Sequence, residues 1–217
     1  MRFFKFNYFY LLTVVSLIIV YLNLLRFNSF QNQVNLIEDL SNNTYEFNVE
    51  NLLNKSYPYP SLTVNSIPIN TLKARYLINL NQIDEALRSI DEGLRYNPYM
   101  IYSHYLKARI YLSQNKLISS LEFLREGFKI SPNNSYLTPL YFTLLAQLNQ
   151  KEELIGVFDI ISGINNIEVW KYYFISLKNI NQLEDKFLSL VIDEAVLSLG
   201  ISMESFLAIV NTQQNSR

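Results

Sequence analysis

Few side chains in this sequence have the chemistry that catalysis requires. His104 is the only histidine, and no acid or nucleophile near it in the sequence completes a group of base, nucleophile and orienting acid. We therefore expect His104 to be partly buried in packing. The chain has no cysteine, which excludes disulfides, thiolate nucleophiles and cysteine metal sites.

Carboxylates occur in three adjacent pairs, Asp84-Glu85, Asp91-Glu92 and Glu152-Glu153. We interpret them as helix-surface charge, and the first and third as acids at the positive start of a helix, rather than as a glycosidase pair. The serines lack a G-x-S-x-G setting, and there is no metal motif or phosphate loop. The sequence thus predicts no enzyme, no catalytic residue, no metal, no cofactor and no small-molecule substrate.

Composition narrows the class of protein further. The formal net charge of −1 gives no general attraction to nucleic acid, so we expect no nucleic-acid partner. Only five glycines argue against a β-rich fold with many tight turns. Apolar residues make up 49% and charged residues 17%, a balance that indicates a membrane segment together with a well-buried helical domain.

An uncharged run extends from Phe6 to Leu25. As a helix it would be about 30 Å long, which matches the hydrocarbon core of a bilayer. A cleaved signal peptide is the rival interpretation, but the apolar run is long for one, and Arg26-Phe27-Asn28 follows it in place of a small-x-small cleavage site. A buried helix of a soluble protein is the other alternative. We expect an uncleaved transmembrane anchor over residues 6–25.

Positive charge predicts the orientation of this anchor. Arg2, Lys5 and the α-amine precede it, whereas Arg26 is the only Lys or Arg between the anchor and Lys55. The positive-inside rule then leaves residues 1–5 in the cytoplasm and exports the C-terminal domain. In a bacterium, the chain would be a single-pass inner-membrane protein facing the periplasm.

The sequence repeats itself after the anchor. Residues 72–98 align without a gap under residues 106–132, with identical residues that include Leu72/Leu106, Lys73/Lys107, Ala74/Ala108, Arg75/Arg109, Gly93/Gly127 and Pro98/Pro132. Every pair has the same offset, which equals the period of about 34 residues found in one class of helical-hairpin repeat. Asn81 and Asn115 fall where each hairpin would turn.

Small residues and prolines in this alignment predict how the repeats pack. Two antiparallel helices approach closely only where side chains are small, and a glycine two turns further along the same face would receive the next repeat. Proline then ends the second helix. The predicted packing residues are Ala74, Ala86, Gly93 and Pro98 in the first repeat and Ala108, Ser120, Gly127 and Pro132 in the second.

These positions resemble the tetratricopeptide repeat (TPR) family over residues 67–132. The chain departs from the family at the first-helix tryptophan position, which is occupied by Asn70 and His104, and lacks the family's lysine and asparagine carboxylate clamp. The resemblance implies an all-α, TPR-like α-solenoid whose first helices line a groove. The residues it places in that groove are Thr71, Arg75, Asn79, Tyr102, Tyr105, Arg109 and Ser113.

Two roles remain open for the arginines. Arg75 and Arg109 hold the same place in successive repeats, so the resemblance implies one surface on which they bind a carboxylate or phosphate. Alternatively, both are solvated or pair with acids such as Glu85 and Glu92.

The rest of the chain is predicted as degenerate helical structure. A linker over residues 26–60 would contain one hairpin, from Gln31–Leu40 and Glu46–Asn54, before Tyr57-Pro58-Tyr59-Pro60. Two recognisable repeats would occupy residues 61–132, and a degenerate repeat with C-terminal helices residues 133–210, before a disordered tail over 211–217. The expected helices after residue 132 are Ser135–Leu148, Glu152–Ile161, Ile167–Lys178, Leu183–Leu199 and Ser202–Val210.

The function expected from the TPR resemblance is a membrane-anchored scaffold for protein–protein interaction in assembly of a cell-envelope complex. Its partner would be a protein segment or a neighbouring membrane protein. A looser resemblance, carried by PSLTVNSIPINTLKARYLI and NPYMIYSHYLKARIYL, links the repeats to the repeat tails of bacterial O-antigen ligase or polymerase-type proteins. That alternative implies an accessory part of surface-polysaccharide biosynthesis or export machinery.

Overall fold

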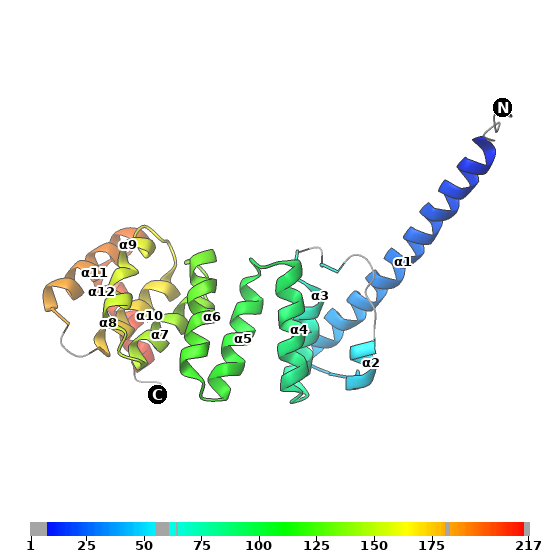
Figure 1. The fold of residues 1–217 in the computed structure, drawn as a ribbon. Coiled ribbons are helices and arrows are strands. Elements are labelled where there is room, and N and C mark those ends of the chain that lie inside the picture. Colours follow the sequence, from blue (N-terminus) through cyan, green and yellow to red (C-terminus); the bar gives the residue numbers. More distant parts are fainter. Residues whose placement is uncertain (1–7, 55–60, 64, 181–182, 215–217) are drawn as a thin grey trace, which may run out of the picture. The chain divides into compact units, whose positions relative to one another are not determined.

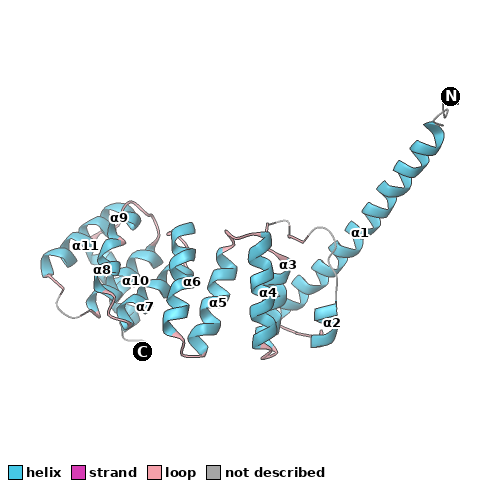
Figure 2. Ribbon diagram, viewed as in Figure 1, coloured by secondary structure: helices cyan, strands magenta, loops and turns pink. Residues whose placement is uncertain are grey.

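The computed structural model describes residues 8–54, 61–63, 65–180 and 183–214. Figure 1 shows the order of the helices along the chain. The chain divides into two compact units, residues 1–98 and 99–217. Helices make up most of the described backbone, and no strand occurs in the described ranges (Figure 2). The all-α architecture predicted from the repeat is therefore confirmed.

Helix α1 runs without a break from Tyr8 to Asn42. It contains an apolar stretch long enough to cross a membrane, and none of that stretch is buried. The expected separate linker helix Gln31–Leu40 is wrong: these residues continue α1, because no glycine or proline interrupts the helix after Leu25. Tyr57-Pro58-Tyr59-Pro60 lies outside the described residues.

The C-terminal part of α1 packs against the first repeat hairpin. Ser29, Gln33, Leu36 and Leu40 are buried on one face of the helix. At its end, the carboxylate of Asp39 accepts hydrogen bonds from the Glu46 N–H, at 3.0 and 3.2 Å, and from the Thr44 hydroxyl. These bonds fix the turn that leads to the short helix α2 (Val49–Asn54).

The first hairpin consists of α3 (Ile69–Asn79) and α4 (Ile83–Tyr96). Ala74 and Ala86 are completely buried. The buried ring of Tyr76 faces the turn after α1, where its hydroxyl accepts a hydrogen bond from the Phe47 N–H at 2.5 Å. Gly93 meets Thr71 of its own hairpin: a Cβ at Gly93 would lie 2.5 Å from the Thr71 hydroxyl oxygen. Thr71 of the same repeat therefore occupies the space beside Gly93.

In the second unit, α5 (Ile101–Ser113) and α6 (Leu117–Ile130) form the next hairpin. Ala108 and Ser120 are completely buried at their contact, and the Ser120 hydroxyl donates to the Ala108 carbonyl at 3.0 Å. Gly127 lies against α7 (Leu137–Gln147), where a Cβ would overlap the Leu137 side chain. Because Gly127 has no side chain, α7 of the next repeat can pack closely against α6.

Three asparagines make the same turn in three successive hairpins. Asn81, Asn115 and Asn149 have φ of 58°, 57° and 52°. Asparagine tolerates this left-handed conformation better than most non-glycine residues, which explains its recurrence at the same place in each repeat. The turn persists in the third hairpin even though that repeat has lost its closing proline.

The second helix of the third hairpin is broken. The sequence predicts one helix over Glu152–Ile161, but the structure has α8 (Lys151–Gly156) and α9 (Phe158–Ile161) on either side of Val157. Glycine is a poor helix former, and Gly156 lies directly before the break. Val157 is itself buried, so the bend carries an apolar side chain into the core.

Three helices complete the second unit: α10 (Ile167–Lys178), α11 (Asp185–Leu199) and α12 (Met203–Gln214). Trp170 of α10 is completely buried, and its indole N–H donates to the Ile164 carbonyl at 2.7 Å. Phe206 of α12 closes this end of the core against Phe174. The predicted tail begins too early, because α12 extends past Val210 to Gln214; residues 215–217 lie outside the described part.

Candidate functional site

A hollow of about 880 Å³ opens on the second unit. It lies along three helices, α5, α7 and α10, which are the first helices of successive hairpins. The residues that line it are Tyr105, Arg109, Leu112, Ser113, Ser135, Tyr136, Pro139, Leu140, Thr143, Glu168 and Tyr172. We call this hollow the groove.

Helical spacing explains which side chains reach the groove. On α5, Tyr105, Arg109 and Ser113 follow one another at every fourth position and share one face. A neighbouring face of α5 carries His104 and Ala108, which are buried. Each first helix therefore buries one face in its hairpin and presents the other to the groove.

Arg109 places an available cation in the groove. Its side chain is exposed, and it forms no ion pair among the described residues. The guanidinium carbon lies 5.7 Å from the centre of the Tyr105 ring. Tyr105 in turn stacks on Tyr102, with ring centres 6.5 Å apart and planes inclined by 21°. The tyrosines thus support the guanidinium without neutralising it.

The opposite wall of the groove carries a neutralised carboxylate. Glu168 of α10 pairs with Lys171 one turn later, at 2.6 Å. The ammonium of Lys171 also lies 5.1 Å from the centre of the neighbouring Tyr172 ring. Because Lys171 already compensates Glu168, Arg109 is left as the charge that the groove offers to a ligand.

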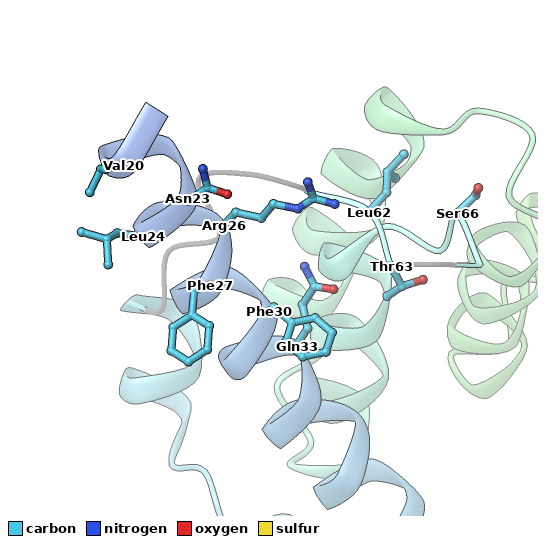
Figure 3. A pocket seen from close by; sticks show the side chains of 10 residues that line it. All are labelled: Val20, Asn23, Leu24, Arg26, Phe27, Phe30, Gln33, Leu62, Thr63 and Ser66. Carbon is cyan, nitrogen blue, oxygen red and sulfur yellow. The ribbon is translucent and has the colours of Figure 1, made fainter. Parts of the chain in front are cut away.

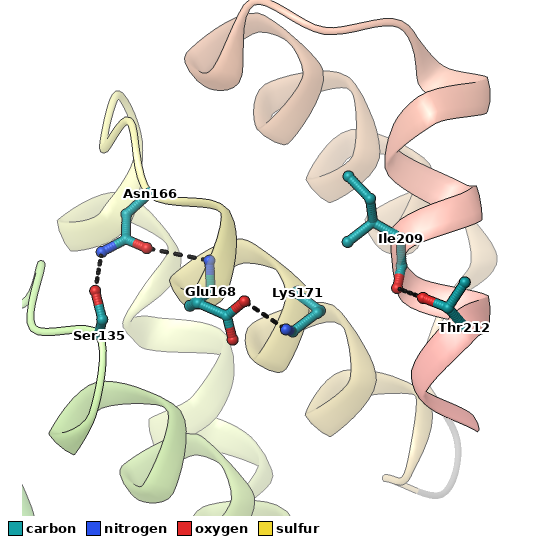
Figure 4. A network of polar contacts seen from close by, with 6 residues as sticks. All are labelled: Ser135, Asn166, Glu168, Lys171, Ile209 and Thr212. Atoms are coloured by element: carbon teal, nitrogen blue, oxygen red, sulfur yellow. Dashed lines mark hydrogen bonds and ion pairs between the residues drawn. The ribbon is translucent and has the colours of Figure 1, made fainter. Parts of the chain in front are cut away.

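Asn166 holds two walls of the groove together (Figure 4). Its amide nitrogen donates to the Ser135 hydroxyl at 3.0 Å, and its carbonyl oxygen accepts from the Glu168 N–H at 3.1 Å. The second bond caps the start of α10. One side chain thereby connects the residues before α7 to the first turn of α10, which favours a preformed groove.

The structure distributes the predicted groove residues over both units. Tyr105, Arg109 and Ser113 line the groove, and Tyr102 supports Tyr105 from beside it. Arg75 and Asn79 lie on α3 in the first unit. Arg75 is half-buried, and the exposed Asn79 donates its side-chain amide to the Arg75 carbonyl at 3.0 Å.

The expected groove position of Thr71 is wrong. Thr71 is completely buried against Gly93, because it lies on the α3 face that packs on α4. The acids considered as partners of the arginines have other partners. Glu85 pairs with Arg88 at 2.7 Å, and Glu92 accepts from the Asn70 amide at 3.0 Å.

Several groove residues were missed by sequence reasoning. Tyr136, Pro139 and Thr143 lie one repeat period after Tyr102, Tyr105 and Arg109, so extending the alignment by one further period would have found them. Glu168 and Tyr172 come from α10, beyond the recognisable repeats, and no sequence signal in this chain marks them.

Outside the groove, the described residues form no cluster of metal-ligating side chains. His104 is 5% exposed, within the α5 face that packs on its hairpin. Across the described ranges, no group of three or more His, Asp or Glu side chains could hold a metal ion.

The sequence of residues 101–134 matches the model of the tetratricopeptide repeat family. The match covers α5, α6 and the following turn, which together make up one repeat. No curated protein matches the chain. The chain is thus a TPR-like helical protein, and such repeats are typically non-catalytic modules for protein–protein interaction.

Proposed function

We propose that this TPR-like chain is a membrane-anchored scaffold whose groove binds a segment of another protein. The observation that carries the proposal is the groove of about 880 Å³ along α5, α7 and α10. It combines exposed aromatic surface with one uncompensated guanidinium, and its described residues hold no grouping suited to bond-making chemistry.

The side chains of the groove indicate the chemistry of the partner. Tyrosine and arginine are among the residues that most often dominate binding energy at protein interfaces. Tyr136 is 76% exposed although it is large and apolar in part, so its ring is available to a partner. We propose an extended segment that places apolar side chains on the tyrosines and a carboxylate near Arg109.

We further propose that α1 anchors the groove to a membrane. The apolar stretch of α1 is exposed in the folded chain, as a lipid-facing helix would be. The positive charges of Arg2 and Lys5 favour a cytoplasmic N-terminus and an exported domain. In a bacterium, that arrangement presents the groove in the periplasm, where a cell-envelope complex would be assembled.

Anchoring is tested by washing membranes with alkaline carbonate. The full-length chain should stay in the pellet, and added protease should degrade the domain only when applied from the exported side. Release by carbonate would refute the anchor, and digestion from the cytoplasmic side would refute the orientation.

Groove binding is tested by capture from a detergent extract, followed by identification of co-purified proteins. Arg109→Ala and Tyr136→Ala should each reduce recovery of the partner. Matched controls are Lys129→Ala and Ile118→Ala, which alter exposed residues of α6 outside the groove. Equal loss in the controls, or no loss in the groove variants, would contradict the proposal.

The alternative partner is surface-polysaccharide machinery, supported by the resemblance of residues 60–112 to O-antigen ligase-type repeat tails. The same capture distinguishes it: recovery of a polytopic glycan ligase or polymerase would favour this alternative over other envelope proteins.

A further inference from the structure

Helix α1 carries an apolar stripe beyond the proposed membrane span. Phe27, Phe30, Val34 and Ile37 are 59%, 49%, 38% and 45% exposed. The other apolar residues of this part, Leu36 and Leu40, are buried against the domain. Asn28, Gln31, Asn35 and Glu38 surround the stripe and are too polar for a hydrocarbon environment. The stripe is therefore an apolar surface that would face water.

Within the proposed membrane span, the same face of α1 carries polar instead of apolar residues. Thr13, Ser16 and Asn23 are the non-aromatic polar residues between Tyr8 and Leu25. The Thr13 hydroxyl donates to the Phe9 carbonyl at 2.9 Å, and the Asn23 amide donates to the Ile19 carbonyl at 2.8 Å. The carbonyl oxygen of the Asn23 side chain accepts no hydrogen bond from a described residue, which is costly in lipid.

The two halves of the stripe form one continuous pattern. Its members are Thr13, Ser16, Val20, Asn23, Phe27, Phe30, Val34 and Ile37, spaced alternately by three and four positions. This spacing is the seam of a left-handed pair of helices. Polar groups in lipid and apolar groups in water are each unfavourable when exposed, and packing against a second helix removes both costs.

Open space lies beside this seam (Figure 3). A hollow of about 860 Å³ has Val20, Asn23, Phe27 and Phe30 along one side and Leu62 and Thr63 along the other. The buried face of α1, around Ser29 and Leu36, lies on a different side of the helix. The domain of the same chain therefore leaves space beside the Val20–Phe30 part of the seam, and Val34 and Ile37 further along are exposed.

We propose that the seam is covered by α1 of a second copy of this chain, packed in parallel. This inference rests on the proposed membrane anchoring. Copies of one chain insert in the same direction, so their seams meet residue for residue at equal depth. Asn23 then lies opposite Asn23, where two amides exchange hydrogen bonds in lipid, and Phe27 and Phe30 meet their counterparts in water. A two-fold pair needs this self-matching of a single surface.

The absence of cysteine permits a direct test in the full-length chain. Single cysteines are placed at the seam, Phe30→Cys or Val34→Cys, and membranes are treated with a mild oxidant. The matched controls are Asn28→Cys and Asn35→Cys, which are also exposed but lie on another face of α1. All four positions are at the surface, so the substitutions should not disturb folding.

Non-reducing electrophoresis should show a species of twice the chain's mass for the seam cysteines and at least tenfold less for the controls. Asn23→Leu, added to Phe30→Cys, should reduce that species. A carbonate wash of each sample separates the two proposals. Retention in the membrane with no dimer, equal cross-linking at all positions, or a cross-link to another protein would overturn the second-copy proposal. Release from the membrane would overturn the anchor as well.

Discussion

Arg125 and Glu153 join the second helices of two successive hairpins through a pair of hydrogen bonds. The Arg125 Nε donates to Glu153 Oε1 at 2.6 Å, and Nη2 donates to Oε2 at 2.9 Å. The Tyr141 hydroxyl also donates to Oε1, at 2.5 Å. These donors, with the nearby charge of Lys129, hold the pKa of Glu153 below its ordinary value of 4.5 although partial burial opposes this. The carboxylate connects α6, α7 and α8 as long as it is ionised.

The lowered pKa predicts a pH dependence of stability. A carboxyl group whose pKa is lower in the folded than in the unfolded state stabilises the fold above its unfolded pKa, near 4.5, and this contribution is lost as pH falls through the folded pKa. Glu153→Gln should lower the free energy of unfolding at neutral pH by about 1–2 kcal/mol, because the pair is partly exposed. It should also reduce the loss of stability on acidification. Thermal melting of the full-length chain in detergent, followed from neutral pH down through the acid range, measures both effects.

Glu152→Gln is the matched control for that variant. Glu152 is the neighbouring acid in the first turn of α8, is exposed, and forms no ion pair with a described residue. Its substitution should leave melting nearly unchanged. Equal effects of the two variants would show that helix-start charge, rather than the Arg125 pair, is responsible.

Gly127 should not tolerate even a methyl group. Alanine there would overlap the completely buried side chain of Leu137, whereas the other helical glycine of this unit, Gly156, has open space around it. Gly127→Ala should lower the free energy of unfolding by about 1 kcal/mol, as overpacking outweighs the gain in helix propensity. Gly156→Ala should leave stability unchanged or raise it by up to about 1 kcal/mol. A shift of the melting temperature in the same direction for both variants would contradict the assigned packing.

Ala108 is predicted to be equally intolerant of added volume. It is completely buried where α5 meets α6, and its carbonyl accepts the Ser120 hydroxyl. Ala108→Leu should cost about 1–3 kcal/mol, because two closely packed helices must separate. The control is Ala208→Leu on the exposed surface of α12. An unchanged melting curve for Ala108→Leu would mean that the hairpin contact lies elsewhere.

The sequence predicted the hairpins well because their determinants are local and periodic. The turns at Asn81 and Asn115 and the small residues Ala74 and Ala108 are repeated at one spacing, and each acts within its own helix pair. The long apolar helix near the N-terminus was equally predictable, because its signal is only the length of the run and the absence of charge.

Features set by tertiary packing were not predictable in this way. Thr71 has the spacing of a groove residue, but contact with Gly93 decides its burial. Two other features were missed although their signals are local: Gly156 directly precedes the bend at Val157, and no glycine or proline interrupts α1 after Leu25. Glu168 joins the groove only because α10 packs beside α7, and no repeat position in the sequence encodes that.

Arg75 and Arg109 are predicted to serve binding rather than folding. Neither forms an ion pair with a described acid, so the double change Arg75→Ala and Arg109→Ala should alter the free energy of unfolding by less than about 1 kcal/mol. Partner capture should nonetheless fall, and most steeply at low salt, where charge is least screened. Capture with each single variant then shows whether Arg75, which lies on the first unit, contributes to partner binding. A large loss of stability would assign the arginines to the fold.

Site-specific photo-cross-linking tests the groove most directly. A photoreactive phenylalanine analogue is introduced at Tyr136 in the groove or at Ile118 on α6, both exposed, and intact membranes are irradiated. We expect a discrete cross-linked protein from position 136, reduced by Arg109→Ala, and none from position 118. Cross-linking of the same protein from both positions, or from 118 alone, would contradict a binding function for the groove.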